Sequence, residues 1–419
     1  MSLGDAMLMT ALWGIWIMLL YWIVLSVGTV RYVRRARQQA VRLSAEFDPA
    51  TAPKVSVLIP AHNEGLVIED TVRALCRQNY PRERFEVVVV NDASTDQTGE
   101  IVDQLRREYP NLIRFDVPVG QGAKGKSRTL NVGLRAASGD VIAVFDADNT
   151  PEPNCLQLLV ATLIDDPSLV AVNGKVRTRN RDASWLTRFI NLEFIYFQWL
   201  FQGGRWQLFG LSMLMGTGYV MYRKAIDALG GFDENSLVDD TEMSLRIFRG
   251  EHRIQWVPYA VTWEQEPDEF GVWLKQRTRW TQGNLSVTAK YLASAFTSPY
   301  PLGLEMLTFA MNYVIFLPAL ITSHLTFVLG LLGVVEVSLS GPFLFLWLLA
   351  LLIYTVHLSF TVSMEDPRPS NYWLAFASYF TYAQMFLLVL CRALWLNAKQ
   401  RLTGDELKWA KTARKREAE

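Results

Sequence analysis

The chain has 419 residues and a formal net charge of zero, which excludes a strongly basic, nucleic-acid-binding protein. Half of the residues are apolar, and they are concentrated towards the two ends of the chain. This distribution predicts a soluble middle block between two membrane-inserted ends. The three cysteines, Cys76, Cys155 and Cys391, lack paired or metal-binding spacing, so we expect all three to be packing residues in a reducing compartment.

The first apolar stretch, residues 7–30, contains no Asp, Glu, Lys or Arg. It is long enough for a helix to cross about 30 Å of hydrocarbon at roughly 1.5 Å per residue. A signal peptide is the alternative, but it would have a shorter apolar core and a small-residue cleavage site. Arginines follow here instead: Arg31, Arg34, Arg35, Arg37 and Arg42. We therefore expect a membrane anchor that places the next segment in the cytoplasm.

Short β-branched runs alternate with helix-like segments in the middle block, residues 53–300. The expected strands cover residues 55–59, 87–90 and 142–145, and the expected helices cover residues 69–78 and 98–109. Continuous apolar runs suit buried parallel strands, and the alternation predicts an α/β, doubly wound, mostly parallel sheet. Ligands bind such sheets at the carboxyl ends of the strands.

Polar side chains follow each of these strands. Residues 60–64 (Pro-Ala-His-Asn-Glu) follow the first, Asp92 lies in the polar run after the second, and Asp146 and Asp148 follow the third. One such run would be explained as a turn, because turns favour Asp, Asn and Ser. Three runs at the same edge of a sheet predict a ligand site.

Asp146 and Asp148 are carboxylates separated by one residue, and they repel each other unless a cation lies near them. Their oxygen atoms suit Mg²⁺ or Mn²⁺, which then hold phosphate oxygens. A solvated turn explains most isolated Asp-x-Asp pairs, but the buried strand before this pair favours a metal–diphosphate site. A Gly/Lys loop, residues 122–126, offers Lys126 to phosphate, although such a loop is a weak signal by itself.

A Gly-Thr-Gly sequence, residues 216–218, precedes a strand-like run at residues 219–222, and Asp240 lies at the start of a helical segment. An Asp near metal-bound phosphates could accept the proton of an acceptor hydroxyl, or it could complement the helix dipole. Residues 276–280 read Gln-Arg-Thr-Arg-Trp. Their arginines suit a departing diphosphate and the tryptophan suits a sugar ring, whereas the alternative is a basic anchor at the membrane surface.

Three more uncharged runs, residues 306–335, 337–364 and 369–391, are each long enough to span a membrane. Three such spans after the anchor would place the basic tail outside, against the positive-inside rule. Either one run is interfacial or re-entrant, or the tail departs from the rule. The expected divisions are an anchor at 1–50, a catalytic domain at 51–300, a membrane region at 301–398 and a charged tail at 399–419. The aromatic segment at 185–209 could line a sugar track, but we expect it to pack against the membrane region.

In this order, the motifs resemble the processive family-2 glycosyltransferases: cellulose, hyaluronan, chitin-oligosaccharide and poly-N-acetylglucosamine synthases. The resemblance covers roughly residues 55–284 and the flanking spans, and residues 263–283 look closest to the poly-N-acetylglucosamine synthases. It implies a GT-A fold and inverting transfer from a UDP-sugar, with UDP-N-acetylglucosamine as a candidate, to a growing β-linked polysaccharide. It also implies Mg²⁺ or Mn²⁺ as cofactor and a multi-pass plasma-membrane protein whose catalytic domain is cytoplasmic.

The resemblance implies roles for individual residues. Ala61, His62 and Glu64 lie in the uridine-binding motif, Asp92 contacts the base, and Lys126, Asp146 and Arg279 also bind the donor. Asp146 and Asp148 hold the metal, and Asp240 is the catalytic base. The acceptor-binding residues are Gly216, Thr217, Gly218, Gln276, Arg277 and Trp280.

One departure is that the family's Thr-Glu-Asp motif reads Val-Asp-Asp at residues 238–240. Asp240 keeps the base, and we expect the following helix to turn Asp239 and Glu242 to other faces. The expected partners are a UDP-sugar, a polysaccharide or oligosaccharide acceptor and membrane lipid, with a small accessory membrane subunit as a further candidate and no nucleic acid.

Two other functions compete with polysaccharide synthesis. A glycosyltransferase could make a single addition to a lipid-linked acceptor, and a non-catalytic membrane scaffold could have kept the fold. The Gln-x-x-Arg-Trp sequence favours the processive synthase over the single addition. The intact Asp146, Asp148, Asp240 and Arg279 disfavour the scaffold.

Overall fold

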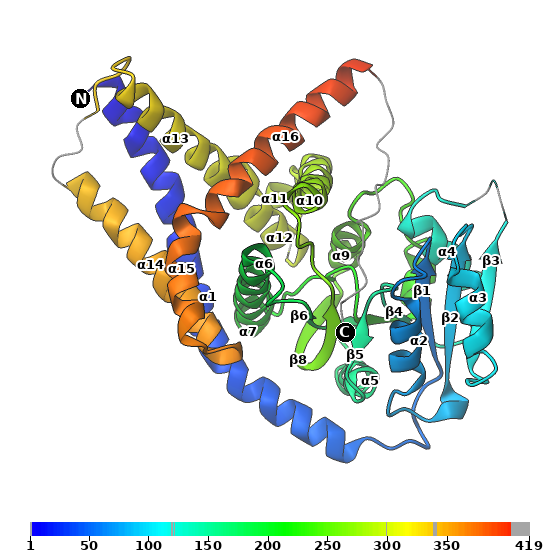
Figure 1. Cartoon of the computed structure of the whole chain (residues 1–419). Helices are drawn as coiled ribbons and strands as arrows, with labels where there is room; N and C mark the ends of the chain where they lie inside the picture. Colours follow the sequence, from blue (N-terminus) through cyan, green and yellow to red (C-terminus); the bar gives the residue numbers. More distant parts are fainter. Residues whose placement is uncertain (1, 119, 121, 299, 338–341, 404–419) are drawn as a thin grey trace.

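The computed structural model describes residues 2–118, 120, 122–298, 300–337 and 342–403, and shows an α/β domain attached to a group of long helices (Figure 1). The strands are β1 (Val55–Ala61), β2 (Phe85–Asp92), β3 (Leu112–Val117), β4 (Val141–Val144), β5 (Thr150–Pro151), β6 (Leu169–Thr178), β7 (Tyr219–Tyr222) and β8 (Arg253–Glu264). The helices of the domain are α2 (Ile68–Cys76), η1 (Arg82–Arg84), α3 (Thr98–Leu105), α4 (Lys126–Ala136), α5 (Cys155–Asp165), α6 (Trp185–Tyr196), η2 (Phe197–Gly204), α7 (Arg205–Phe209), α8 (Arg223–Ala228), α9 (Asp239–Arg249), α10 (Phe270–Tyr291) and α11 (Ser294–Thr297). The remaining helices are α1 (Leu3–Glu46), α12 (Leu302–Ala310), η3 (Met311–Phe316), α13 (Leu317–Leu331), α14 (Pro342–Glu365), α15 (Pro369–Phe380) and α16 (Tyr382–Thr403).

The eight strands form one mixed sheet in the order β3-β2-β1-β4-β7-β6-β8-β5. Strand β1 is parallel to β2 and β4, β2 is parallel to β3, and β7 is antiparallel to β4 and β6. The predicted α/β sheet is confirmed, and the three expected strands correspond to β1, β2 and β4. Because β2, β1 and β4 are parallel neighbours, the polar segments that follow them meet at one edge of the sheet.

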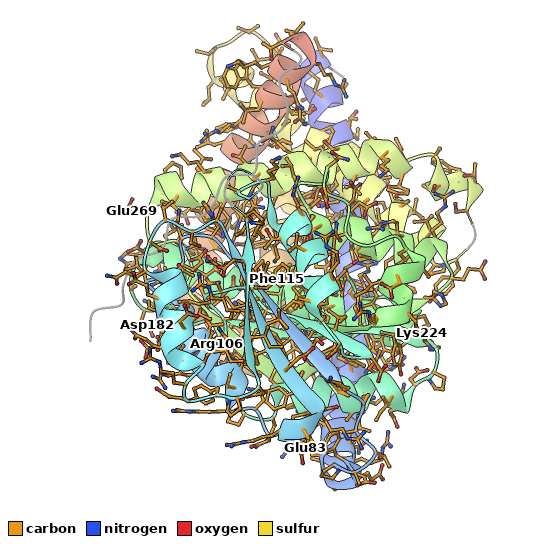
Figure 2. All side chains as sticks on the ribbon, turned by 90° about the vertical axis from the view of Figure 1, so that its right-hand side faces the viewer. Glu83, Arg106, Phe115, Asp182, Lys224 and Glu269 are labelled. Carbon is orange, nitrogen blue, oxygen red and sulfur yellow. The ribbon has the colours of Figure 1, made fainter. Side chains whose placement is uncertain are left out.

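Both faces of the sheet are covered, which explains why its strands are continuously apolar. Val57 and Val87 pack on one face with α2, α3 and α5, and Leu58 and Val88 pack on the other face with α4, α8 and α9. Charged side chains such as Arg106 lie on the outer surface of the domain (Figure 2).

All three cysteines are free, and two of them pack as expected. Cys76 and Cys155 belong to the first core. The expectation that Cys391 is also a packing residue is wrong, because it is exposed on α16.

Among the described residues, three helices are long and apolar enough to cross a membrane: α1, the continuous stretch Leu302–Leu331, and Phe345–Glu365 within α14. The third expected C-terminal run is not one straight helix. It breaks at Thr381, whose φ of −123° and ψ of −83° are not helical, and α15 and α16 meet there at a bend of 41°. The expected charged tail begins within α16, and its residues 404–419 lie outside the described part of the chain.

Helix α1 connects the membrane region to the α/β domain without interruption. It runs for 44 residues, so its apolar first part and its arginines belong to one helix. Arg42 pairs with Asp165 of α5 at 2.7 Å, and Gly28 packs so closely on η2 that an added Cβ would lie 2.5 Å from the carbonyl oxygen of Gly204. The anchor is therefore fixed to the domain at two places.

Candidate active site

The first polar motif and Asp92 come together at the carboxyl ends of β1 and β2. His62 Nδ1 donates to the carbonyl oxygen of Asp92 at 2.6 Å, and the Thr129 hydroxyl donates to Asp92 Oδ2 at 2.9 Å. The Gly/Lys loop crosses directly over this carboxylate, because a Cβ added at Gly122 would lie 2.6 Å from Asp92 Oδ1. Ala61, His62 and Glu64, the predicted uridine-binding residues, line a cavity at this edge.

Lys126, Asp146 and Asp240 converge around Gly216. The Lys126 ammonium lies 2.5 Å from Asp146 Oδ1 and donates to the carbonyl oxygen of Gly216 at 2.7 Å. Gly216 has a φ of +80°, and an added Cβ would lie 3.4 Å from Asp240 Oδ2. A glycine is favoured here because the backbone is left-handed and the Asp240 carboxylate lies close above it.

Burial changes the proton affinities of this cluster. Burial, followed by the neighbouring Asp239 carboxylate, raises the pKa of Asp240 from 3.8 to about 7, against the opposing hydrogen bond from the Thr241 N–H. Burial also raises the pKa of Asp239. Burial alone would lower the pKa of Lys126, but Asp146, Asp239 and Asp240 raise it, so the ammonium stays charged. Asp240 is therefore poised to exchange a proton near neutral pH.

Asp239 and Asp240 both line the cavity. The expectation that α9 turns Glu242 away is confirmed, since Glu242 Oε2 pairs with Arg246 Nε at 2.7 Å inside the domain. The same expectation is wrong for Asp239, which lies close enough to Lys126, Asp146 and Arg279 for their charges to affect its pKa. Consecutive helical residues point only about 100° apart, and the first turn of α9 faces the cavity.

The carboxylates fit a divalent cation. The described residues contain no preformed group of three His, Cys, Asp or Glu ligands. Asp146 and the buried Asp148 nevertheless supply hard oxygen donors next to β4, and Asp239 Oδ2 is buried without a hydrogen-bond partner in the described part of the chain. Mg²⁺ and similar ions are commonly held by one or two carboxylates, with substrate phosphates and water completing the shell. The donor set therefore suits such an ion once a diphosphate is present.

Helix α10 carries the Gln-x-x-Arg-Trp sequence into the same cavity. Gln276, Arg279 and Trp280 line it, together with Gly216 and Thr217. The predicted acceptor residue Gly218 lies behind them, where its N–H donates to the carbonyl oxygen of Val144 at 2.9 Å.

Arg277, also predicted to contact the acceptor, lies behind the cavity wall. Its guanidinium pairs with Glu193 at 2.8 Å and stacks on Trp280, with 4.2 Å between Cζ and the ring centre. Burial alone would lower the pKa of Arg277, but Glu193 raises it, so the side chain is a buried cation.

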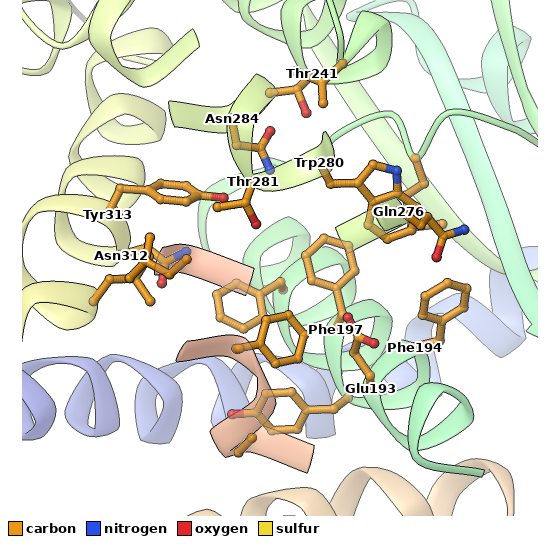
Figure 3. A pocket seen from close by; sticks show the side chains of 18 of the residues that line it. Glu193, Phe194, Phe197, Thr241, Gln276, Trp280, Thr281, Asn284, Asn312 and Tyr313 are labelled. Atoms are coloured by element: carbon orange, nitrogen blue, oxygen red, sulfur yellow. The ribbon is translucent and has the colours of Figure 1, made fainter. Parts of the chain in front are cut away.

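The cavity has a volume of about 1290 Å³ and is continuous from the donor motifs to the space between the membrane helices. Figure 3 shows its middle section, where Trp280 and Gln276 lie across from Phe197 and Glu193, with Asn312 and Tyr313 to one side. Below this section the lining comes from α1, α13, α14 and α16. The donor site and the membrane region therefore share one chamber.

The aromatic segment at residues 185–209 was expected to pack against the membrane region, and part of it lines the cavity. Phe194 and Phe197 line the cavity, whereas Trp199 packs on Trp256 and Trp185 is exposed, so the aromatic segment both lines the cavity and packs. Glu193 is the only acid in that segment. A lone acid in a largely apolar run is the signal that could have identified it.

The same signal applies to Arg205 and Glu305, which form a buried ion pair in the cavity wall. Glu305 is the only acid between residues 302 and 331, a stretch that is otherwise apolar enough to span a membrane. Burying charged groups in an apolar helix costs free energy, so such groups are candidates for a functional role.

Residues 52–283 match the sequence family described as "Glycosyltransferase like family 2". The chain is 38% identical over 415 residues to the "Probable glycosyltransferase YdaM" of Bacillus subtilis (strain 168), covering 98% of each protein. It is 31% identical to the "Beta-monoglucosyldiacylglycerol synthase" of Synechocystis sp., covering 70% of this chain and 63% of that protein. It is 26% identical to the "Poly-beta-1,6-N-acetyl-D-glucosamine synthase" of Staphylococcus aureus (strain COL), covering 69% of this chain and 68% of that protein.

Among solved structures, a mannosyltransferase from Pyrobaculum calidifontis, in complex with GDP-Man and Mn²⁺, has the same fold. The TM-score is 0.59 at 22% identity, covering 92% of this chain and 100% of that chain. Together with the family match and the cavity geometry, this likeness confirms the GT-A fold. The chain belongs to glycosyltransferase family 2 and is a glycosyltransferase.

Proposed function

We propose that the protein transfers a sugar, with inversion and with a divalent metal ion, from a UDP-sugar to the end of a growing β-linked glycan at the membrane. The observation that carries this proposal is the continuous cavity, which connects the nucleotide motifs with the space between the membrane helices. A chain that grows at the donor site has room to extend along this cavity as sugars are added.

At the donor end of the cavity, we assign a role to each predicted residue. Ala61, His62, Glu64 and Asp92 hold the uridine, while Lys126 and Arg279 hold the diphosphate. Asp146 and Asp148 would hold Mg²⁺ or Mn²⁺, and the bound ion would supply positive charge to neutralise the departing diphosphate. The Mn²⁺ in the related mannosyltransferase structure supports this choice of ion.

Asp240 accepts the proton of the attacking hydroxyl. Its carboxylate lies beside Gly216, within the group of charges that includes Lys126 and Asp146. With a pKa raised to about 7, it is partly ionised at neutral pH and is a stronger base than an ordinary carboxylate. Inversion requires attack on the face of the sugar opposite the leaving diphosphate, and Trp280 offers a flat surface on which the acceptor can stack.

Polar atoms in the membrane part of the cavity favour a glycan over an acyl chain. Six residues that line this part of the cavity, from six different helices, each carry a buried side-chain atom with no hydrogen-bond partner among the described residues: Trp22 Nε1, Tyr196 Oη, Arg205 Nε, Asn284 Oδ1, Glu305 Oε1 and Gln384 Oε1. Each such atom destabilises the protein by roughly 1–3 kcal/mol if it stays unpaired. These residues add polar groups to the largely apolar wall of the membrane part of the cavity, which suits a hydrated glycan better than an acyl chain.

A single addition to a lipid-linked acceptor is the second candidate. Apolar side chains such as Leu19, Phe316 and Leu320 also line the membrane part of the cavity. The relative named as a glucosyldiacylglycerol synthase supports an acceptor of this kind. The two candidates share the donor site and differ in the product that they release.

The contacts of α15 and α16 suggest how the chain crosses the plasma membrane. Before α15, Arg368 pairs with Asp182 at 2.8 Å; at the break, Trp273 Nε1 donates to Tyr382 at 3.0 Å; near the end of α16, Gln282 donates to Asn397 at 3.1 Å. In each of these contacts the partner residue (Asp182, Trp273 or Gln282) belongs to the catalytic domain.

The α15–α16 pair thus contacts the catalytic domain at its start, its middle and its end, so it does not cross the membrane. Three spans then remain, from α1, α12–α13 and α14. With the catalytic domain in the cytoplasm, the basic tail is cytoplasmic as well, which removes the conflict with the positive-inside rule.

A donor screen tests the proposed function. The purified protein is incubated with Mn²⁺ or Mg²⁺ and each of several UDP- and GDP-sugars, and release of the nucleotide diphosphate is measured. We expect release from a UDP-sugar, with UDP-N-acetylglucosamine as the first candidate. Release from GDP-sugars alone would contradict the proposed donor class.

A further inference from the structure

Arg277 contacts residues of the cavity wall without lining the cavity itself. Only 2% of its surface is exposed. Its guanidinium lies over the ring of Trp280, with 4.2 Å between Cζ and the ring centre, and its Nη1 donates to Gln276 Oε1 at 2.9 Å. One buried side chain therefore contacts both the tryptophan and the glutamine of the Gln-x-x-Arg-Trp sequence.

Residues from two other helices hold Arg277 in place. Arg277 Nη2 donates to Glu193 Oε2 of α6 at 2.8 Å. The hydroxyl of Tyr382, the first residue of α16, donates to the same oxygen at 2.5 Å, and Trp273 Nε1 donates to that hydroxyl at 3.0 Å. Because a guanidinium is planar and donates in fixed directions, these partners set its plane. The indole of Trp280 packs against this fixed guanidinium.

We propose that Arg277, held by Glu193 and Tyr382, is a positioning residue that fixes Trp280 and Gln276 in the orientation that receives the acceptor sugar. This inference rests on the proposed function, in which Trp280 stacks on the acceptor. Tyr382 lies directly after the break between α15 and α16, so the same network connects the membrane-side helices to the acceptor site.

The chain provides a matched control. Arg177 is also a paired and stacked arginine, with 4.6 Å from Cζ to the ring centre of Trp263 and 3.0 Å to Glu365. Neither Arg177 nor Trp263 lines the cavity. Glu193 does line it, so its replacement could act on the acceptor directly, and Arg277 is the better residue to test.

The first test observes Trp280 itself. The full-length protein is labelled with 5-fluorotryptophan, and the ¹⁹F resonance of Trp280 is assigned with Trp280→Phe. We expect Arg277→Leu to shift or broaden this resonance, Arg277→Lys to do so less, and Arg177→Leu to leave it unchanged. An unchanged Trp280 resonance in Arg277→Leu would overturn the inference, whatever the activity.

The second test separates acceptor use from donor chemistry, with UDP-N-acetylglucosamine as donor and a β-linked N-acetylglucosamine tetrasaccharide as acceptor. We expect Arg277→Leu to raise the acceptor KM about tenfold, the size of a lost stacking contact, while donor hydrolysis to UDP stays within about twofold. In a Trp280→Ala background, Arg277→Leu should add only the smaller effect that passes through Gln276; a full additional effect would show that Arg277 does not act through Trp280. If Trp280 responds in the NMR test but the wild type uses no UDP-sugar, the proposed function fails and the positioning role stands.

Discussion

The two neighbouring aspartates at the start of α9 give the most informative mutational prediction. Asp240→Asn keeps the size and hydrogen bonding of the side chain but cannot accept a proton. We expect the turnover rate to fall by at least roughly a hundredfold, with UDP binding nearly unchanged. Asp239→Asn keeps the base and removes the second cause, after burial, of the raised pKa of Asp240.

The raised pKa of Asp240 sets the expected size of the change in kcat/KM with pH. With a pKa of about 7, the Asp240 carboxyl is ionised to about a tenth at pH 6 and about nine-tenths at pH 8, so kcat/KM should rise roughly tenfold over this range. A carboxyl with an ordinary pKa would give a flat profile there. Asp239→Asn should lower the pKa of Asp240 and move the rise in kcat/KM to lower pH. At pH 6 the variant should therefore retain a larger fraction of its own maximal kcat/KM than the wild type does.

UDP release, measured from pH 5.5 to 9 at a fixed metal concentration, tests both statements. If Asp240→Asn keeps near-normal turnover while Asp239→Asn is inactive, Asp239 is the essential carboxylate of the pair and the assignment of Asp240 as the base is wrong. If both variants stay active, the base lies elsewhere and the mechanism proposed here is wrong.

Two further predictions concern the metal and the membrane. Excess chelator should abolish turnover and Mn²⁺ or Mg²⁺ should restore it, because Asp146, Asp148 and a diphosphate repel one another without a cation; full activity in chelator would rule out the metal site. In a cysteine-free background, single cysteines at Glu83 on the outer surface of the domain (Figure 2) and at Lys399 on α16 should both be shielded from an impermeant thiol reagent in intact cells and react after lysis. Labelling of Glu83→Cys in intact cells would overturn the cytoplasmic orientation, and labelling of Lys399→Cys alone would show that α15–α16 crosses the membrane.

Much of the donor side could be predicted because local sequence determines it. Buried parallel strands produce continuous apolar runs, and their order along the chain places Asp92 and Asp146 at one sheet edge. Strands β6 and β8 were not predicted, and their residues pair across more than 80 positions of sequence, as Leu169 does with Arg253. Such pairing leaves no local signal.

The acceptor side was harder to predict, because it depends on how helices pack. The motif made Arg277 a candidate acceptor contact, but the orientation of α10 turns it towards Glu193. Tyr382 joins the same cluster only because the last apolar run breaks at Thr381, and its sequence contains no Gly or Pro at that point to indicate a break. The positions of Arg277 and Tyr382 therefore depend on contacts between helices that are distant in the sequence, and the sequence pattern does not show such contacts.

The length of the product tests the central claim most directly. The wild-type protein in lipid vesicles is incubated with Mn²⁺ and the radiolabelled UDP-sugar that supports UDP release, and the products are separated by gel electrophoresis and by organic extraction. The proposed function predicts a water-soluble glycan that lengthens with time and is absent with Asp240→Asn. A single labelled sugar that partitions entirely into the organic phase as a lipid would contradict it.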